Sequence, residues 1–277
     1  MKADCHIHMV LDGLDWKQAI GRHCQKPEED FIRAALKTWQ DLGYTYLRDG
    51  GDRWGVGAKA RALAPEFGIT YRTPLAPLCK EGHYGSFIGL TYRTEKEYAA
   101  LVQKQKQEGA DFIKIMISGL MDFNHFGVLT EEGLPPEEIA MLIHIAHEEG
   151  MAVMAHANGA RTVEAAAKAG IDSVDHGAYL DGDALAAMEE AGTVWVPTLS
   201  AVGNLLGKGR FPDQEVAPIL ESAWENLANY KGLVASGTDA GAWAVPHGSQ
   251  TEDALLAKAG IDEARLAQGA AMIMKKF

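Results

Sequence analysis

The stretch Asp4-Cys5-His6-Ile7-His8-Met9 stands almost at the start of the chain and places two histidines two residues apart in a short apolar run. In a β-strand, residues i and i+2 point to the same face, so we expect both imidazole rings to point in one direction. Imidazole nitrogen is a common ligand of zinc, manganese and iron. A single His-x-His pair also occurs on ordinary surfaces and in cores, so its meaning depends on which other side chains reach the same place.

The chain after this stretch repeats one pattern: residues with helical periodicity, then a glycine, then a short apolar or β-branched run. Glycine commonly follows a helix because it adopts positive φ without steric cost. The glycines are Gly43, Gly68, Gly109, Gly150, Gly170, Gly192 and Gly232, and the runs that follow them are 44–49, 69–78, 110–117, 151–156, 171–176, 193–198 and 233–239. Together with the first strand, the pattern predicts eight strands.

The helical stretches between these runs carry start signals. Thr94 and Glu97 form the pattern of a capping box, two prolines precede a helix expected over 137–149, and Asp183 is expected to open a helix over 184–191. Eight alternating strands and helices predict an α/β fold, a (β/α)8 TIM-type barrel of parallel strands. A doubly wound open sheet is the competing architecture, although no glycine-rich phosphate loop follows the first strand.

Composition narrows the class of protein. The chain has 277 residues, 47% of them hydrophobic, and we expect residues 1–277 to form one barrel domain. A net charge of −12 without a basic patch argues against nucleic acid or an anionic membrane as a partner. Three cysteines without framework spacing indicate reduced thiols, and no signal segment or apolar run of membrane-spanning length is present. We therefore expect a cytoplasmic protein, and a homo-oligomer fits the sequence as well as a monomer.

In a TIM-type barrel the active site lies at the carboxyl ends of the strands, and polar side chains collect there in this chain. They are His6, His8, Arg48, Asp49, Lys114, His156, His176 and Asp239. Lys114 stands in the apolar run Phe112-Ile113-Lys114-Ile115-Met116, where a charged amine is costly unless it is paired or neutral. It is either a lysine paired at a strand end or a lysine of lowered pKa that reacts with carbon dioxide to give a metal-bridging carbamate.

The remaining strand-end residues also allow two interpretations. His156 and His176 end successive strands, which favours metal ligation over two separate structural histidines. Asp239, in Gly237-Thr238-Asp239, is either a turn residue or both a metal ligand and the general base for a water molecule. For Arg48 we favour a structural role over binding of a substrate carboxylate.

The set Asp4-x-His6-x-His8, Phe-Ile-Lys114-Ile-Met, Met-Ala-His156-Ala, Asp-His176-Gly and Gly-Thr-Asp239 resembles the amidohydrolase superfamily in order and spacing along nearly the whole chain. It is most similar to the imidazolonepropionase-like or prolidase-like branch of metal-dependent hydrolases. Many relatives carry a small β-sandwich built from segments on either side of the barrel. From where this sequence starts and stops, we expect that domain to be absent.

The resemblance implies a site with two divalent metal ions, zinc or else manganese or iron. It implies that His6, His8 and Asp239 bind one ion, that His156 and His176 bind the other, and that carbamylated Lys114 bridges them. A hydroxide between the ions would attack a carbonyl carbon, and Asp239 would pass the proton to the leaving amine.

These features predict a hydrolase of C–N amide bonds that acts on a small molecule such as a dipeptide, an N-acyl amino acid or a cyclic amide. The alternatives are an ester, lactone or phosphotriester hydrolase with the same site, a mononuclear deaminase, and a catalytically silent barrel that binds a metal or ligand. The candidate substrate-binding residues follow strand ends and are His83, Tyr84, His125, Tyr179 and His247. His144 and His147, one helical turn apart, are expected at the surface.

Overall fold

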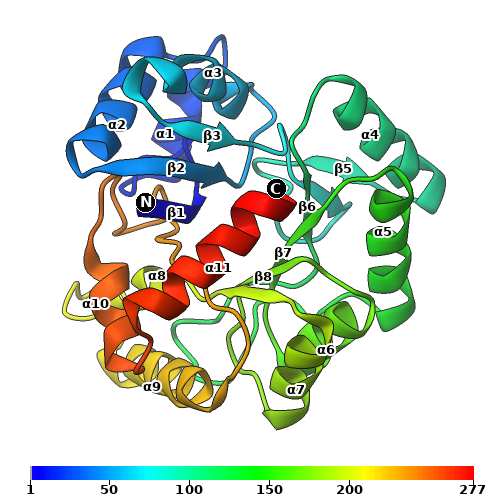
Figure 1. The fold of residues 1–277 in the computed structure, drawn as a ribbon, viewed down its shortest axis with the longest axis vertical. Helices are drawn as coiled ribbons and strands as arrows, with labels where there is room; N and C mark the ends of the chain where they lie inside the picture. The colour runs from blue at the N-terminus through cyan, green and yellow to red at the C-terminus, as the bar shows by residue number, and fades with distance from the viewer. Residues whose placement is uncertain (1) are drawn as a thin grey trace.

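The structure, a computed structural model, describes residues 2–277 as a ring of parallel strands surrounded by helices (Figure 1). The strands are β1 (Lys2–Ile7), β2 (Tyr44–Asp49), β3 (Thr70–Arg72), β4 (Leu78–Lys80), β5 (Leu90–Tyr92), β6 (Ile113–Met116), β7 (Val153–Ala157), β8 (Ser173–His176) and β9 (Val194–Val196). The helices are α1 (Trp16–His23), α2 (Glu29–Asp41), α3 (Val56–Leu63), the 3-10 helix η1 (Ala64–Phe67), α4 (Glu95–Gln107), α5 (Pro136–Glu148), α6 (Ala160–Lys168), α7 (Gly182–Ala191), α8 (Ser200–Gly203), α9 (Asp213–Asn229), α10 (Thr251–Lys258) and α11 (Glu263–Lys276).

The strands form two parallel arcs, ordered β1-β2-β3 and β5-β4-β6-β7-β8-β9. At one junction between the arcs the chain passes directly from β3 to β4, because these two strands belong to one run that is interrupted at 73–77. The other is the segment 233–240, which forms parallel bridges from Val234 to Trp195 and from Ala240 to Ile7. The expected TIM-type arrangement is thus confirmed, with its last position filled by an irregular segment.

Two of the predicted strands were wrong in detail. The run 69–78 is broken because Pro74 and Pro77 lack the backbone N–H that a ladder needs. The run 233–239 contains no strand, and Asp239 has a positive φ of 58°. A further strand, β5, pairs with β4 and was not predicted.

Most helix signals were confirmed. The Thr94 hydroxyl accepts a hydrogen bond from the Glu97 N–H at 3.2 Å, as expected of a helix cap. The expected cap Asp183 was wrong, because Asp181 caps α7 and accepts from the Ala184 N–H at 2.9 Å. Gly232 was also wrong as a helix end, since α9 stops at Asn229.

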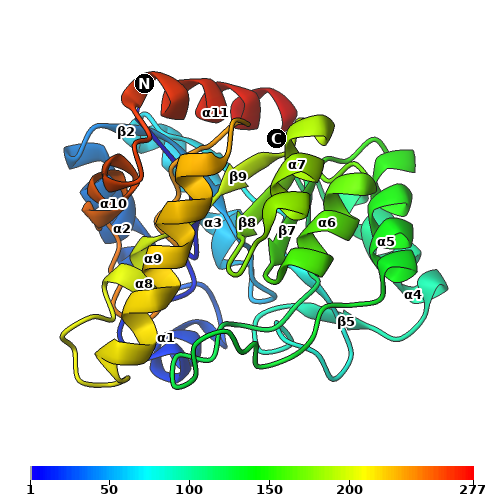
Figure 2. The same cartoon turned by 90° about the horizontal axis from the view of Figure 1, so that it is seen from below.

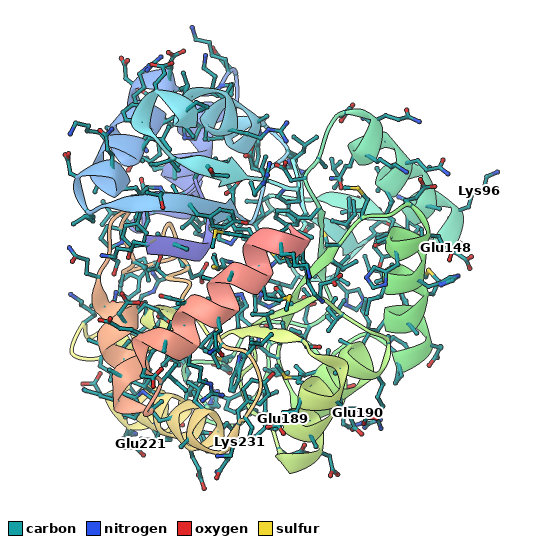
Figure 3. All side chains as sticks on the ribbon, in the orientation of Figure 1. Lys96, Glu148, Glu189, Glu190, Glu221 and Lys231 are labelled. Carbon is teal, nitrogen blue, oxygen red and sulfur yellow. The ribbon has the colours of Figure 1, made fainter. Side chains whose placement is uncertain are left out.

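The two ends of the ring differ. Helix α11 lies across one end, and α1 with the loop between β6 and α5 lies at the other (Figure 2). Charged side chains of the outer helices, such as Lys96, Glu148 and Glu221, point away from the strands (Figure 3). No helix within residues 2–277 is both long and apolar enough to cross a membrane. All three cysteines are free thiols.

Candidate active site

Four histidines gather inside the end of the ring that lies opposite α11. The ring centroids of His6 and His8 are 5.1 Å apart, those of His6 and His176 are 4.9 Å apart, and those of His156 and His176 are 4.5 Å apart. All four side chains are at least nine-tenths buried. The structure therefore brings together the imidazoles from β1, β7 and β8, as the strand-end argument predicts.

His6, His8 and Asp239 form the tightest set. The two imidazole Nε2 atoms are 3.2 Å apart, and the Asp239 Oδ1 atom lies 3.4 Å from the first and 3.5 Å from the second. Ligands about 2.0–2.1 Å from a tetrahedral ion lie about 3.3–3.4 Å from one another, so these three atoms have the spacing of metal ligands. Within residues 2–277, no other group of three His, Cys, Asp or Glu side chains meets the same distance criterion.

The tautomer of His6 is fixed by a buried charged network. The His6 Nδ1–H donates to the Asp175 carboxylate at 2.5 Å, which leaves the Nε2 lone pair directed at His8 and Asp239. The Arg48 guanidinium donates to the same carboxylate at 3.0 Å and to the Cys5 carbonyl oxygen at 2.7 Å. Arg48 thus ties β2 to β1 and β8, in agreement with the structural role favoured from the sequence.

The segment that carries Asp239 is attached to β1. The Asp4 carboxylate accepts hydrogen bonds from the Thr238 N–H at 3.0 Å and from the Thr238 hydroxyl at 2.6 Å, and the Asp239 N–H donates to the His6 carbonyl oxygen at 2.8 Å. The backbone of Asp239 and that of His176 (φ 76°) are both left-handed, a conformation that non-glycine residues adopt at a cost. Two of the six described non-glycine residues with positive φ are therefore candidate ligands.

Lys114 ends in the interior without a partner. Its side chain is fully buried, and its amine forms no hydrogen bond with any described residue. Burial lowers the pKa of this amine to about 8, although the Asp175 carboxylate acts in the opposite direction. A substantial fraction of the amine is therefore uncharged at slightly alkaline pH.

Burial also sets the charge states of the other groups. It lowers the pKa of both His8 and His156 to about 3, and the charge of Lys114 acts in the same direction. It raises the pKa of Asp239 to about 7. Neutral imidazole is the form that binds metal ions, and a carboxyl group that titrates near pH 7 can both accept and donate a proton.

His156 and His176 are positioned by polar neighbours. The His156 Nε2 atom is 3.2 Å from the Gly119 carbonyl oxygen, and the His176 Nδ1 atom is 2.7 Å from the Thr198 hydroxyl. These two histidines are adjacent to the set formed by His6, His8 and Asp239 but do not join it within the distances that define that set.

The candidate substrate-binding residues lie in different surroundings. The Tyr84 ring packs against the His156 ring with a centroid distance of 4.8 Å. The Tyr179 ring instead packs against the Phe126 ring, with a centroid distance of 5.6 Å. His83 lies 3.6 Å from Glu131. The other two contact none of the four buried histidines. His125 is exposed beside Asp122, and His247 contacts the Leu11 carbonyl oxygen and Phe31.

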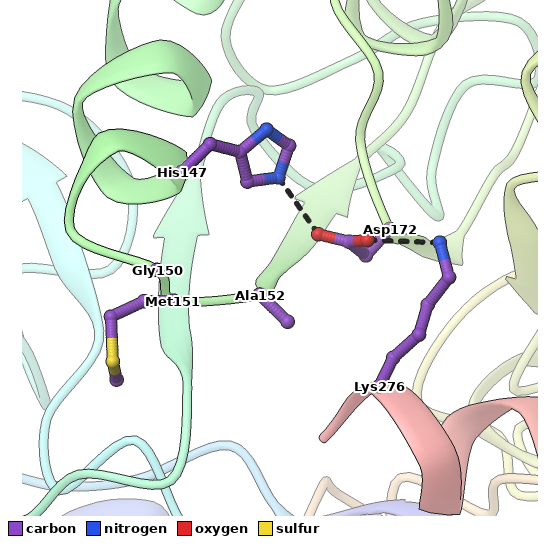
Figure 4. A pocket seen from close by; sticks show the side chains of 6 residues that line it. All are labelled: His147, Gly150, Met151, Ala152, Asp172 and Lys276. Carbon is purple, nitrogen blue, oxygen red and sulfur yellow. Dashed lines mark hydrogen bonds and ion pairs between the residues drawn. The ribbon is translucent and has the colours of Figure 1, made fainter.

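The surface histidines were placed correctly. His144 and His147 are exposed on α5, and the His147 ring lies 2.9 Å from the Asp172 carboxylate. Figure 4 shows Asp172 between His147 and Lys276 in a shallow pocket at the α11 end of the ring. This pocket is at the amino ends of β7 and β8, opposite the histidines.

Comparisons with known proteins agree with the geometry. A sequence profile described as "Amidohydrolase family" matches residues 4–271. The chain is 26% identical over 274 residues to ochratoxinase from Aspergillus niger, covering 84% of this chain and 55% of that protein. It therefore spans little more than half the length of this curated relative.

Solved structures show the same fold. A Xaa-Pro dipeptidase with bound methionine superposes with a TM-score of 0.78 at 21% identity, covering 99% of this chain and 75% of that one. Ochratoxinase from A. niger superposes with a TM-score of 0.74 at 21% identity, covering 96% and 68%. Both likenesses support the barrel architecture.

Proposed function

Because the chain belongs to the amidohydrolase family, we propose that it hydrolyses a C–N amide bond in a small molecule with the help of two divalent metal ions. The observation that carries this proposal is the spacing of 3.2–3.5 Å among the His6, His8 and Asp239 donor atoms. A buried amine without a partner lies in the same interior, at Lys114. Buried polar groups without partners lower the free energy of unfolding, so both features are best explained by a bound ligand.

The donor atoms fit two ions of the zinc, manganese or iron type. His6, His8 and Asp239 would hold one ion, and His156 with His176 would hold the second. Lys114 would contribute as a carbamate: its neutral amine attacks carbon dioxide, the new N–C bond forms, and a proton is released. As a carbamate, Lys114 would offer oxygen ligands to metal ions, and bound ions would give the buried side chain the partners that it otherwise lacks.

Bound ions would supply Lewis acidity, which lowers the pKa of water and polarises the substrate carbonyl. The chain's own residues would do the remaining work. Asp239, whose pKa is about 7, would accept a proton from the attacking water and deliver it to the leaving amine nitrogen. Asp175 would keep the His6 Nδ1 atom protonated, so that the opposite nitrogen stays available as a ligand.

The test combines metal content with a pair of substrates. Protein expressed with zinc or manganese and bicarbonate should contain close to two ions per chain and should hydrolyse N-acyl amino acids or dipeptides. Lys114→Ala should lower metal content and activity together, whereas Lys96→Ala, at an exposed site on α4, should change neither.

Other results would point to the alternatives. Faster hydrolysis of matched esters or lactones than of amides would indicate an esterase-type reaction. One ion per chain, unaffected by Lys114→Ala, would favour a mononuclear deaminase. Metal binding with no hydrolysis across an amide, ester and lactone panel would leave a silent barrel and refute the proposal.

A further inference from the structure

The large hydrophobic side chains that residues 2–277 expose to solvent lie in two segments: the loop after β1 with the start of α1, here called the first loop, and the loop after β6, here called the second loop. Leu14 and Trp16, 74% and 47% exposed, follow β1, and Phe126 and Val128, 46% and 47% exposed, follow β6. Both loops lie at the end of the ring opposite α11 (Figure 2), which is the end at which the strands that carry the histidines terminate. Exposed apolar side chains gathered at one place are typical of a binding surface.

The first loop is joined to the site by a continuous line of aromatic rings, here called the aromatic wall, formed by Trp16, Phe87 and Tyr84. The Trp16 and Phe87 centroids are 5.4 Å apart, and those of Phe87 and Tyr84 are 5.8 Å apart. The Tyr84 ring then meets the His156 ring at 4.8 Å. The wall therefore runs from a candidate metal ligand to a solvent-exposed indole.

The second loop contacts an aromatic ring that follows a histidine-bearing strand. The Phe126 ring packs edge-on against the Tyr179 ring at 5.6 Å, and Tyr179 stands three residues after His176. The second loop is also joined to the segment 81–89 that carries Tyr84 and Phe87, because the Tyr84 N–H donates to the Glu131 carboxylate at 2.8 Å and Glu131 lies in the loop after β6. The aromatic wall and the pair formed by Phe126 and Tyr179, together called the aromatic lining, thus lie at the same end of the ring as the candidate ligands.

We propose that this aromatic lining determines which amide the site accepts, and that the preferred substrate carries an aromatic ring on its acyl or its amine side. The inference rests on the proposed amide hydrolysis. Rings held edge-to-face offer flat apolar surface to a further ring, and such contacts add to the gain from burial. Contact with the His156 ring places that surface next to the reacting bond.

A second copy of the chain is the competing occupant. A stable interface between copies buries roughly 1,200–2,000 Å² in total, with a contiguous apolar centre. Four exposed side chains in two separate loops provide much less than this, and the aromatic wall continues inward to the site instead of spreading over the outer helices. The geometry therefore favours a small ring-bearing molecule.

The test compares N-acetylglycine with two ring-bearing amides, N-benzoylglycine and N-acetylphenylalanine. At least one of the latter should have a kcat/KM about tenfold or more above that of N-acetylglycine. Trp16→Ala should reduce this preference about tenfold. Leu14→Ala, which removes a neighbouring exposed apolar side chain but no ring, should keep it. Phe126→Ala and its neighbour Val128→Ala form the matched pair for the second loop.

Equal kcat/KM values for the three compounds, or an unchanged preference in Trp16→Ala and Phe126→Ala, would overturn the inference. If the protein hydrolyses none of the three, the wider amide, ester and lactone panel decides the proposed function, and calorimetric titration of the metal-loaded protein with the same three compounds decides the inference alone. Tighter binding of a ring-bearing amide, lost in Trp16→Ala, would support it, and equal or absent binding would overturn it. A dimer in sedimentation velocity that Trp16→Ala dissociates would also overturn it, because the lining would then be an interface between copies.

Discussion

Replacing Lys114 by methionine should stabilise the metal-free protein. Methionine fills nearly the volume of the lysine stem but carries no charge. The fall in the pKa of the buried amine from 10.5 to about 8, at about 1.4 kcal/mol per pKa unit, corresponds to about 3–4 kcal/mol of unfavourable burial. We therefore expect Lys114→Met to raise the free energy of unfolding by about 3–4 kcal/mol at pH 7.

The dependence on pH identifies the cause. Below pH 8 the amine is protonated in both the folded and the unfolded chain, so the full penalty applies. Between pH 8 and 10.5 the folded protein loses the proton while the unfolded chain keeps it, and the penalty falls as the pH rises. The difference in the free energy of unfolding between Lys114→Met and the unchanged protein should therefore fall towards zero near pH 10.5.

The assay is urea unfolding of metal-free protein at pH 7 and at pH 10, in buffers free of bicarbonate so that no carbamate forms. Lys96→Met, at an exposed position, should change the free energy of unfolding by less than about 0.5 kcal/mol. A less stable Lys114→Met protein at pH 7, or a gain that does not change with pH, would refute the reasoning. The expected result would mean that this lysine is retained at the expense of stability, as at many functional sites.

Three further predictions follow from the site and its supports. Added zinc should raise the Tm in a concentration-dependent manner, and at one hundred times the Kd it should raise the free energy of unfolding by about 2.7 kcal/mol. Calorimetry should show this effect lost in His6→Ala and kept in the exposed His144→Ala. Metal affinity should fall about tenfold per pH unit as the pH drops below 7, because Asp239 must lose a proton to bind; titrations that show no such fall in the native protein, or the same fall in Asp239→Asn, would contradict this. Gly57→Ala should destabilise the protein by about 2 kcal/mol or more, because a Cβ atom would stand 2.2 Å from the Asp49 carboxylate, whereas Gly21→Ala has open space and should stabilise it by about 0.5–1 kcal/mol in urea unfolding.

The sequence predicts elements whose signals are local. The bounds of β2, Tyr44–Asp49, agree with the prediction because the preceding Gly43 follows a helix end and the run itself begins with aromatic and β-branched residues. The histidines and Lys114 could be assembled at one end of the ring because parallel strands place their carboxyl ends together. The irregular segment 233–240 was not foreseen, since its backbone bonds go to β1 and β9, which are distant in sequence.

Asp175 is the clearest residue that the sequence did not reveal. It was noted only as the neighbour of His176, yet it pairs with both His6 and Arg48, 169 and 127 residues away. A weak signal existed: Ser173 and Asp175 are polar residues at i and i+2 in an apolar run, which places both side chains on the inner face. Identifying their partners requires knowing how the ring closes.

The segment that carries Asp239 lies between the first and the last strands, next to β1 with its two histidines. The line along which β1 meets residues 233–240 is here called the seam. The candidate ligands on its two sides come from opposite ends of the sequence, so we expect the binding site to form late, after the ring closes. During synthesis the N-terminal histidines emerge long before Asp239 is made, and a partly made chain would bind a metal ion only weakly. Contacts of such large sequence separation also slow folding. An ion bound across the seam would then act as a clasp, and it should slow amide hydrogen exchange most along β1 and residues 233–240.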